Sequence, residues 1–397
     1  MCSRILRCIL ISVLISTAFF SIFWLDFTHD RTNSKPVILN SSRDPVVIAS
    51  PPADYNCCKP LNITLRKHIY FVKTHKTGST TVQNIILRFA LNHSLDIMNT
   101  IYFLYYQPFS DQSIYPFLRT PNNKYHVLAS HVRYTSELRW YQYPNTPMVT
   151  IMRHPAKLFP SLYNYFHMNE TTGMTFQQFM NAPVKPAFVT SSMNMLVYRG
   201  YNQMSYDLGF DLITSGRNQT TINEFIEKID REFDFVMIME HMEASLVLLA
   251  NLMGWPLEYV AHLKMNVSPA DSSNTYKLSF KDELTLLHLN HVDSLLYHHF
   301  LNKFRACVRK YGEVKMQRKI IQLRKLNQKL KHRCVAGERV GGLNFGYFQA
   351  IEYVPKNTSD LECVYATSME IPFEIIVMEE QFKKLHNPRN KNQYYKT

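Results

Sequence analysis

Short apolar runs along the chain alternate with longer segments in which apolar residues recur every three to four positions. The first run is HIYFVKT at 68–74, and the segment after it, STTVQNIILRFAL at 79–91, has apolar residues at Val82, Ile85, Ile86 and Phe89. A short bounded run predicts a buried strand, and the longer spacing predicts an amphipathic helix. The loop at 74–78 therefore joins a strand to a helix.

The same alternation continues toward the C-terminus. Each apolar run of strand length is followed, directly or after a loop, by a segment with helical spacing, which is the arrangement of a mostly parallel sheet flanked by helices. We therefore predict an α/β fold. Further strands are expected within 124–131, 147–154 and 233–241, and helices within 155–168, 243–255, 281–312 and 313–333.

The first residues form a different kind of segment. Arg4 and Arg7 precede an uncharged apolar run at 8–25, which is about the length of a bilayer-spanning helix. The basic side is expected in the cytosol, and bulky residues stand where a cleaved signal peptide needs small ones. We predict a cytosolic tail at 1–7, a transmembrane signal-anchor at 8–25, a luminal stem at 26–64, the main luminal domain at 65–335 and a C-terminal extension of that domain with a frayed basic tail at 336–397.

Composition adds a compartment and a charge. The chain is 46% hydrophobic, enough for a sizeable core, and its net charge of +13 suits an anionic ligand or an anionic membrane surface without choosing between them. Seven N-x-Ser/Thr sequons favour the lumen: Asn40, Asn62, Asn92, Asn169, Asn218, Asn266 and Asn357. An oxidising lumen also favours disulfides, with the pairing left open among Cys57, Cys58, Cys307, Cys334 and Cys363.

The loop after the first strand, in FVKTHKTGST, has its lysine two residues before its only glycine. An ATP-type loop has the lysine directly after its last glycine, so a nucleotide kinase is disfavoured. The helix N-terminus still favours an anion, and Gly78 permits close approach of the backbone. Lys76 adds positive charge, and Ser79, Thr80 and Thr81 add hydroxyl donors. The alternative is an unspecialised turn in which a serine caps the helix.

At this point the residues resemble a known family. HKTGSTT is similar to the 5′-phosphosulfate loop of sulfotransferases that use 3′-phosphoadenosine 5′-phosphosulfate (PAPS), with His75 in place of the usual proline. With that histidine the loop resembles the galactose 3-O-sulfotransferases, the group that includes galactosylceramide sulfotransferase. VTIMRHPAKLFPSLYNYF resembles the family's 3′-phosphate site, and here His154 stands where the family often has Asp. The likeness extends over about 69–304, and nothing after Tyr311 is recognised.

The resemblance implies a PAPS-dependent carbohydrate O-sulfotransferase with a luminal domain on a single-pass type II Golgi membrane protein. The acceptor would be a galactose hydroxyl, the 3-OH, of a glycolipid or glycan. It implies neither a metal nor nucleic acid, and a homo-oligomer is compatible with it. The residues in the family's cofactor-binding positions are Lys76, Thr77, Gly78, Ser79, Thr80, Thr81, Arg153 and Ser161.

Sulfuryl transfer requires stabilisation of the leaving phosphate and a base for the acceptor hydroxyl. Lys76 is expected to stabilise the leaving group. Histidine suits the base, because its pKa lies near the working pH. His131, which follows the second predicted strand, is the first candidate, and His75 within the loop is the alternative. Two other functions stay open: sulfation of a uronic acid in a proteoglycan, and a non-catalytic luminal protein that binds carbohydrate.

Overall fold

The computed structural model describes residues 65–101, 108–183, 185, 200–212, 218–265, 277–341 and 350–387. The chain divides into two compact units, 1–46 and 47–397, and every described residue belongs to the second. The predicted tail, signal-anchor and stem therefore lie outside the described residues, as does the predicted frayed end after Asn387. Within the ranges above, no helix combines the length and apolar character needed to span a bilayer.

Four parallel strands form the central sheet, as the alternation predicts. They are β1 (Ile69–Lys73), β2 (Val127–His131), β3 (Met148–Met152) and β4 (Phe235–Ile238), and their order across the sheet is β2-β1-β3-β4. Every residue of β1, β3 and β4 is buried. Strands covered on both faces read as continuous apolar runs in the sequence. The predicted strands are therefore confirmed.

The predicted helices are also present, with one correction. They are α2 (Ser79–Asn92), α3 (Pro155–Tyr165), α9 (Met242–Met253) and α12 (Glu313–Cys334). The segment at 281–312, predicted as one helical stretch, forms two helices, α10 (Phe280–Leu289) and α11 (His291–Tyr311). The break falls at Asn290, whose backbone ψ of 48° leaves the helical region. Because apolar residues recur at helical spacing on both sides of Asn290, the sequence pattern does not reveal the break between the two helices.

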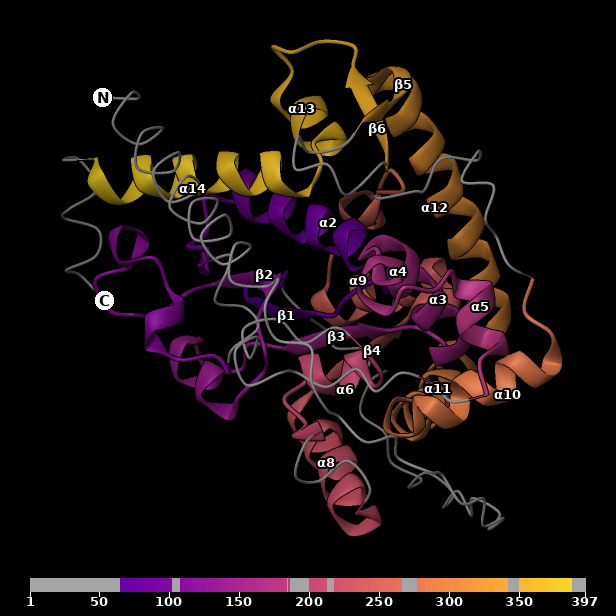
Figure 1. Cartoon of the computed structure of the whole chain (residues 1–397). Helices are drawn as coiled ribbons and strands as arrows, with labels where there is room; N and C mark the ends of the chain where they lie inside the picture. Colours follow the sequence, from indigo (N-terminus) through magenta and orange to yellow (C-terminus); the bar gives the residue numbers. More distant parts are fainter. Residues whose placement is uncertain are drawn as a thin grey trace, which may run out of the picture. The chain divides into compact units, whose positions relative to one another are not determined.

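Further short helices connect these elements. They are α4 (Met168–Thr172), α5 (Phe176–Asn181), α6 (Gln203–Asp207) and α8 (Gln219–Glu232), with 3-10 turns η3 (Asp111–Ser113), η4 (Pro116–Leu118), η5 (Ser136–Tyr141), η6 (Met239–His241) and η7 (Leu257–Val260). In Figure 1, α2 and α14 (Glu370–His386) lie on one side of the strands, and α6 and α8 lie on the other. The sheet is thus flanked by helices, as expected.

The C-terminal part of the chain packs back onto the sheet domain. A two-stranded antiparallel hairpin, β5 (Val335–Gly341) with β6 (Ala350–Pro355), precedes α13 (Leu361–Thr367) and α14. Both α13 and α14 contact α2, which itself packs on β1 and β2. A disulfide between Cys334 and Cys363 joins the end of α12 to α13, and Cys307 is disulfide-bonded as well. Helices α13 and α14 are consequently part of the wall around α2.

Candidate active site

The carboxyl ends of three neighbouring strands bring the predicted site residues together. Lys73, the last residue of β1, lies directly opposite His131, the last residue of β2. The loop carrying His75 and Lys76 follows β1, and Arg153 follows β3. Open α/β sheets bind ligands at this edge, because every strand delivers its following loop there. One edge of the sheet thus holds both sequence motifs.

The loop between β1 and α2 adopts a backbone that permits close approach to the helix N-terminus. Lys76 has φ of 57° and Gly78 has φ of 76°, both in the left-handed region. Gly78 is the N-cap of α2 and no side chain caps this helix. The serine cap of the alternative reading is therefore wrong, because glycine occupies the N-cap position. A Cβ atom at position 78 would lie 3.0 Å from Cε of Met242.

The loop hydroxyls bond to the protein itself. The Ser79 hydroxyl donates to the Thr74 carbonyl at 2.7 Å, and the Thr77 hydroxyl donates to the same carbonyl at 3.1 Å. The Thr80 hydroxyl donates to Glu370 at 2.9 Å. The Thr81 hydroxyl oxygen accepts a hydrogen bond from a backbone N–H. The donors that the loop presents to an anion are therefore chiefly the backbone N–H groups of the first helical turn.

Two cations sit beside this helix N-terminus. The Lys76 ammonium lies 3.5 Å from the centroid of the Tyr165 ring, and the Arg153 guanidinium donates to the Lys76 carbonyl at 2.9 Å. Burial, and then the Arg153 charge, lowers the pKa of Lys76 to about 8, and burial lowers the pKa of Arg153. Among the described residues, neither side chain forms an ion pair. Two partly desolvated cations without a direct ion-pair partner among the described residues fit a phosphate-bearing ligand.

The rest of the second motif, VTIMRHPAKLFPSLYNYF, is held in place by hydrogen bonds at the start of α3. Ser161 lies in the second turn of α3 and is half-buried. The backbone N–H of His154 donates to one carboxylate oxygen of Glu240 at 3.0 Å, and the Tyr297 hydroxyl donates to the other at 3.1 Å. Glu240 thereby fixes the start of α3, which carries Ser161 and directly follows Arg153.

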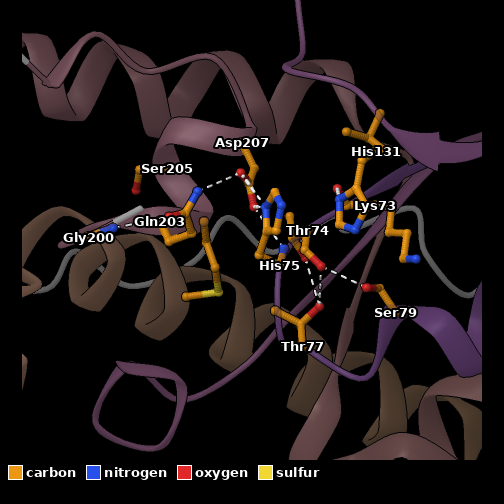
Figure 2. A network of polar contacts seen from close by, with 12 residues as sticks. Lys73, Thr74, His75, Thr77, Ser79, His131, Gly200, Gln203, Ser205 and Asp207 are labelled. Atoms are coloured by element: carbon orange, nitrogen blue, oxygen red, sulfur yellow. Dashed lines mark hydrogen bonds and ion pairs between the residues drawn. The ribbon is translucent and has the colours of Figure 1, made fainter. Parts of the chain in front are cut away.

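The two candidate bases form one cluster. The rings of His75 and His131 stack with centroids 4.2 Å apart and an interplanar angle of 20°. The His75 Nδ1 lies 2.9 Å from both carboxylate oxygens of Asp207, and the His75 backbone N–H donates to the same carboxylate at 2.8 Å. Figure 2 shows His75 held between Asp207, at the end of α6, and His131. Asp207 thereby fixes both the ring and the backbone of the loop histidine.

His131 is oriented by the neighbouring strand. Its Nδ1 lies 3.1 Å from the Lys73 carbonyl oxygen, which can only accept, so the ring proton resides on Nδ1 and Nε2 is the basic atom. Burial, reinforced by the nearby His75 and Lys73 charges, holds the pKa of His131 well below its ordinary value. The ring is therefore neutral near pH 7, which is the form that accepts a proton.

Sequence reasoning missed Glu370, which lies at the start of α14. Its carboxylate forms an ion pair with Lys73 and accepts from the Thr80 hydroxyl at 2.9 Å. The same carboxylate lies 3.9 Å from Nε2 of His131. Burial opposes ionisation of this carboxyl, but Lys73 outweighs it and the pKa of Glu370 lies below its ordinary value. No pattern in the sequence links Glu370 to a loop almost 300 residues earlier.

A pocket opens beside this cluster, on the side of β2 and α14. It is small, with a cavity volume of about 40 Å³, and its lining includes His131, Ser130 and Glu374. His131, the first candidate for the base, therefore lines an opening at the edge of the sheet. Within the part of the chain that the structure describes, no group of three or more His, Cys, Asp or Glu side chains is arranged to hold a metal ion.

Comparisons with known proteins agree with this geometry. The family model for galactose-3-O-sulfotransferases matches residues 5–343. Galactose-3-O-sulfotransferase 3 of Homo sapiens is 32% identical over 303 residues, which cover 73% of this chain and 68% of the relative. Galactosylceramide sulfotransferase of Bos taurus is 30% identical over 307 residues, covering 75% of this chain and 70% of the relative. The chain therefore belongs to the galactose-3-O-sulfotransferase family.

Proposed function

We propose that this protein transfers a sulfuryl group from PAPS to the 3-hydroxyl of a galactose on a glycolipid or glycan. Membership in the family makes the chain a carbohydrate sulfotransferase. The observation that carries the donor assignment is the pair of half-buried cations, Lys76 and Arg153, at the N-terminus of α2 without an ion-pair partner among the described residues. Their charge is complementary to a ligand that carries several phosphate-type oxygens.

The residues divide into a donor side and an acceptor side. When bound, PAPS supplies a sulfuryl group attached to a phosphate, which is a good leaving group. The loop at 76–81, with Thr77, Gly78 and the first N–H groups of α2, would hold the 5′ end, and Arg153 with Ser161 would hold the 3′-phosphate. Lys76 would stabilise the negative charge that develops on the leaving phosphate. No metal ligand set is needed for this division of work.

The acceptor side requires a proton acceptor next to the pocket. Nε2 of His131 is the basic atom of a neutral imidazole that lines the pocket, so it would take the proton of the acceptor hydroxyl. His75, bound to Asp207 through its ring and its backbone N–H, would keep the loop and the His131 ring in place. Positioning of this kind contributes much of the rate in group-transfer reactions.

The proposal includes a location. The predicted signal-anchor at 8–25, with basic residues before it, and the seven sequons support a single-pass type II protein of the Golgi membrane with its catalytic domain in the lumen. Fluorescence of a tagged full-length chain at the Golgi, together with loss of electrophoretic mass on removal of N-glycans, is the expected result. Cytosolic fluorescence and an unchanged mass would contradict this part of the proposal.

The experiment that tests the reaction uses the full-length chain in detergent with sulfur-labelled PAPS. Acceptors are β-galactosyl lipids, β-galactosyl oligosaccharides and uronic acid polymers. We expect label on galactosides alone, at the 3-position. Label only on uronic acid polymers would keep the chemistry but overturn the acceptor. Folded protein that neither binds 3′,5′-ADP nor transfers label would overturn the donor assignment.

A further inference from the structure

The C-terminal end of α3 returns to the loop between β1 and α2. Tyr165 is the last residue of α3, and the Lys76 ammonium lies over its ring, 3.5 Å from the ring centroid. The next ring, that of Phe166, lies 4.9 Å from the Tyr165 ring and 5.9 Å from the His75 ring, measured between centroids. The helix that starts beside Arg153 therefore ends against both candidate residues of the loop.

Lys76 is consequently contacted from both ends of one helix. The Arg153 guanidinium, just before α3, donates to the Lys76 backbone carbonyl at 2.9 Å. Tyr165, at the other end of α3, contacts the Lys76 side chain instead. Ser161, which occupies the position that resembles the family's 3′-phosphate serine, lies between them in the same helix. The segment that would bind the 3′ end of the donor thus also holds the cation that would serve its 5′ end.

The ring contact favours the charged form of Lys76. The face of an aromatic ring attracts an ammonium within about 6 Å, and the attraction grows where water is excluded. Burial is the largest cause that lowers the pKa of Lys76 to about 8, so this amine is partly desolvated. Three other charges face it: Arg153 after β3 and Lys73 on β1 lower the pKa, and Glu370 on α14 raises it. The Tyr165 ring, on α3, acts in the same direction as Glu370.

We propose that Tyr165 is a positioning residue of the sulfuryl-transfer site, whose ring holds the Lys76 ammonium in the loop and favours its charged form for the leaving phosphate. This inference rests on the proposed function and deepens it, because Tyr165 is not among the residues in the family's cofactor-binding positions. In this role the ring forms no bond with the donor and acts through Lys76 alone.

The test measures 3′,5′-ADP binding to the full-length chain in detergent by calorimetric titration from pH 6.5 to 9, beside label transfer from PAPS. Tyr165→Leu removes the ring, and Tyr165→Phe retains it. Loss of the ring lowers the pKa of Lys76, so the pH at which 3′,5′-ADP affinity decreases should move from about 8 to about one unit lower in Tyr165→Leu. It should not move in Tyr165→Phe. At pH 7.5, Tyr165→Leu should weaken the affinity about 3-fold or more, and at pH 6.5 by much less.

Tyr311→Leu is the matched control. Tyr311 is the last residue of α11, and the Lys315 ammonium lies 4.4 Å from the centroid of its ring. This variant therefore removes the same kind of contact, at the same position in a helix, between two residues that belong to neither motif. It should leave both the 3′,5′-ADP affinity and its pH dependence unchanged.

A double-mutant cycle separates positioning from a merely structural role. In a Lys76→Gln background the side chain has no charge, so Tyr165→Leu should change the 3′,5′-ADP affinity less than about twofold. An equal loss with and without the Lys76 charge would show that Tyr165 only supports the fold and would overturn the proposal. If Tyr165→Leu does not fold, Tyr165→Phe decides, since a pH dependence displaced by about one unit despite the retained ring would overturn the role of the ring.

The two readouts also separate this inference from the proposed reaction. A displaced pH dependence of 3′,5′-ADP binding in Tyr165→Leu, without any sulfate transfer by the wild-type chain, would keep the positioning role and overturn the reaction. Transfer by the wild-type chain, with the same pH dependence of binding in Tyr165→Leu, would keep the reaction and overturn the role of Tyr165.

Discussion

At the scale of single residues, ion pairing decides which of two lysines, Lys73 or Lys76, is available to bind the sulfate donor. Lys73 is fully buried, but its charge is compensated by Glu370. Lys76 lies three residues later on the Tyr165 ring, and no carboxylate among the described residues pairs with it. Partial desolvation of a cation without an ion-pair partner costs free energy that a bound anion would recover. Lys76 is therefore the residue whose charge is available to the ligand.

Lys76→Ala should lower kcat about 100- to 1,000-fold, the range for loss of one group that stabilises a developing negative charge. Lys157→Ala is the matched control, because Lys157 is an exposed lysine at the start of α3. The measurement is label transfer to galactoside at saturating PAPS, with unfolding temperature as a check. A kcat within twofold of wild type in Lys76→Ala would contradict the assigned role.

The pH profile follows from the shifted pKa of His131. Because burial and the charges of His75 and Lys73 lower that pKa, the neutral base persists as pH falls through 6.5. Glu370 also faces the ring and acts in the opposite direction, but the net shift is downward. We expect protonation of His131 to decrease kcat/KM only below about pH 6.5. A separate decrease is expected as pH rises through about 8, where Lys76 loses its charge.

His131→Ala should lower kcat/KM about 100-fold or more and remove this acid limb from the residual activity. His75→Ala should lower kcat/KM while the limb remains, because His75 acts through position. An acid limb that persists in His131→Ala and vanishes in His75→Ala would assign the base to His75. Both profiles are read from initial rates at subsaturating galactoside.

At the scale of elements, the junction between β1 and α2 depends on glycine. Gly78 has φ of 76°, and a Cβ there would meet Cε of Met242 at 3.0 Å. Gly173 has φ of 66°, and a Cβ there would meet no atom within 4 Å. An alanine at 173 therefore has the cost of a left-handed backbone without the steric contact. Comparison of the two alanine variants therefore isolates the close approach at the loop.

Gly78→Ala and Gly173→Ala should each destabilise the fold by about 1 kcal/mol, the cost of a left-handed backbone at a residue with a Cβ. Only Gly78→Ala should also weaken 3′,5′-ADP binding, by about 10-fold, because the loop has to shift. Calorimetric titration and urea unfolding measure the two quantities. Equal 3′,5′-ADP affinities in both variants would show that the loop tolerates a side chain at this position.

At the scale of the whole molecule, the disulfide between Cys334 and Cys363 ties α13, and through it the start of α14, to the rest of the domain. The residues it joins are separated by 29 positions. Restricting a loop of that length in the unfolded chain stabilises the native state by about 3 to 4 kcal/mol. The disulfide therefore supports the wall that carries Glu370 and Glu374.

The double variant Cys334→Ser with Cys363→Ser should unfold at lower urea concentration and should lose acceptor affinity more than 3′,5′-ADP affinity. The reason is that α14 lines the opening beside His131, the proposed base, while Lys76 and Arg153 are placed by β1 and β3. Chemical unfolding and the two binding titrations provide the comparison. Parallel loss of both affinities would indicate that the disulfide supports the whole site.

The sequence alone determined the elements whose signals are local. The buried runs, the helix spacing and the carboxyl-edge placement of His75, Lys76, His131 and Arg153 could all be predicted, because parallel strands deliver their loops to one edge. Resemblance of the two motifs pointed to the family, which the comparisons confirm. The division of 281–312 at Asn290 escaped prediction because one residue's backbone decides it.

Only the tertiary structure decided which charges are compensated and which remain available. Glu370 and Glu374 reach the site from a helix nearly 300 residues beyond the loop, and Asp207 reaches His75 across 132 residues. Such contacts depend on packing between distant segments, which leaves no periodic mark in the chain. The sequence thus identified the cations and histidines of the site. The fold identified the carboxyl groups beside them: Glu370 pairs with Lys73, and Asp207 orients His75.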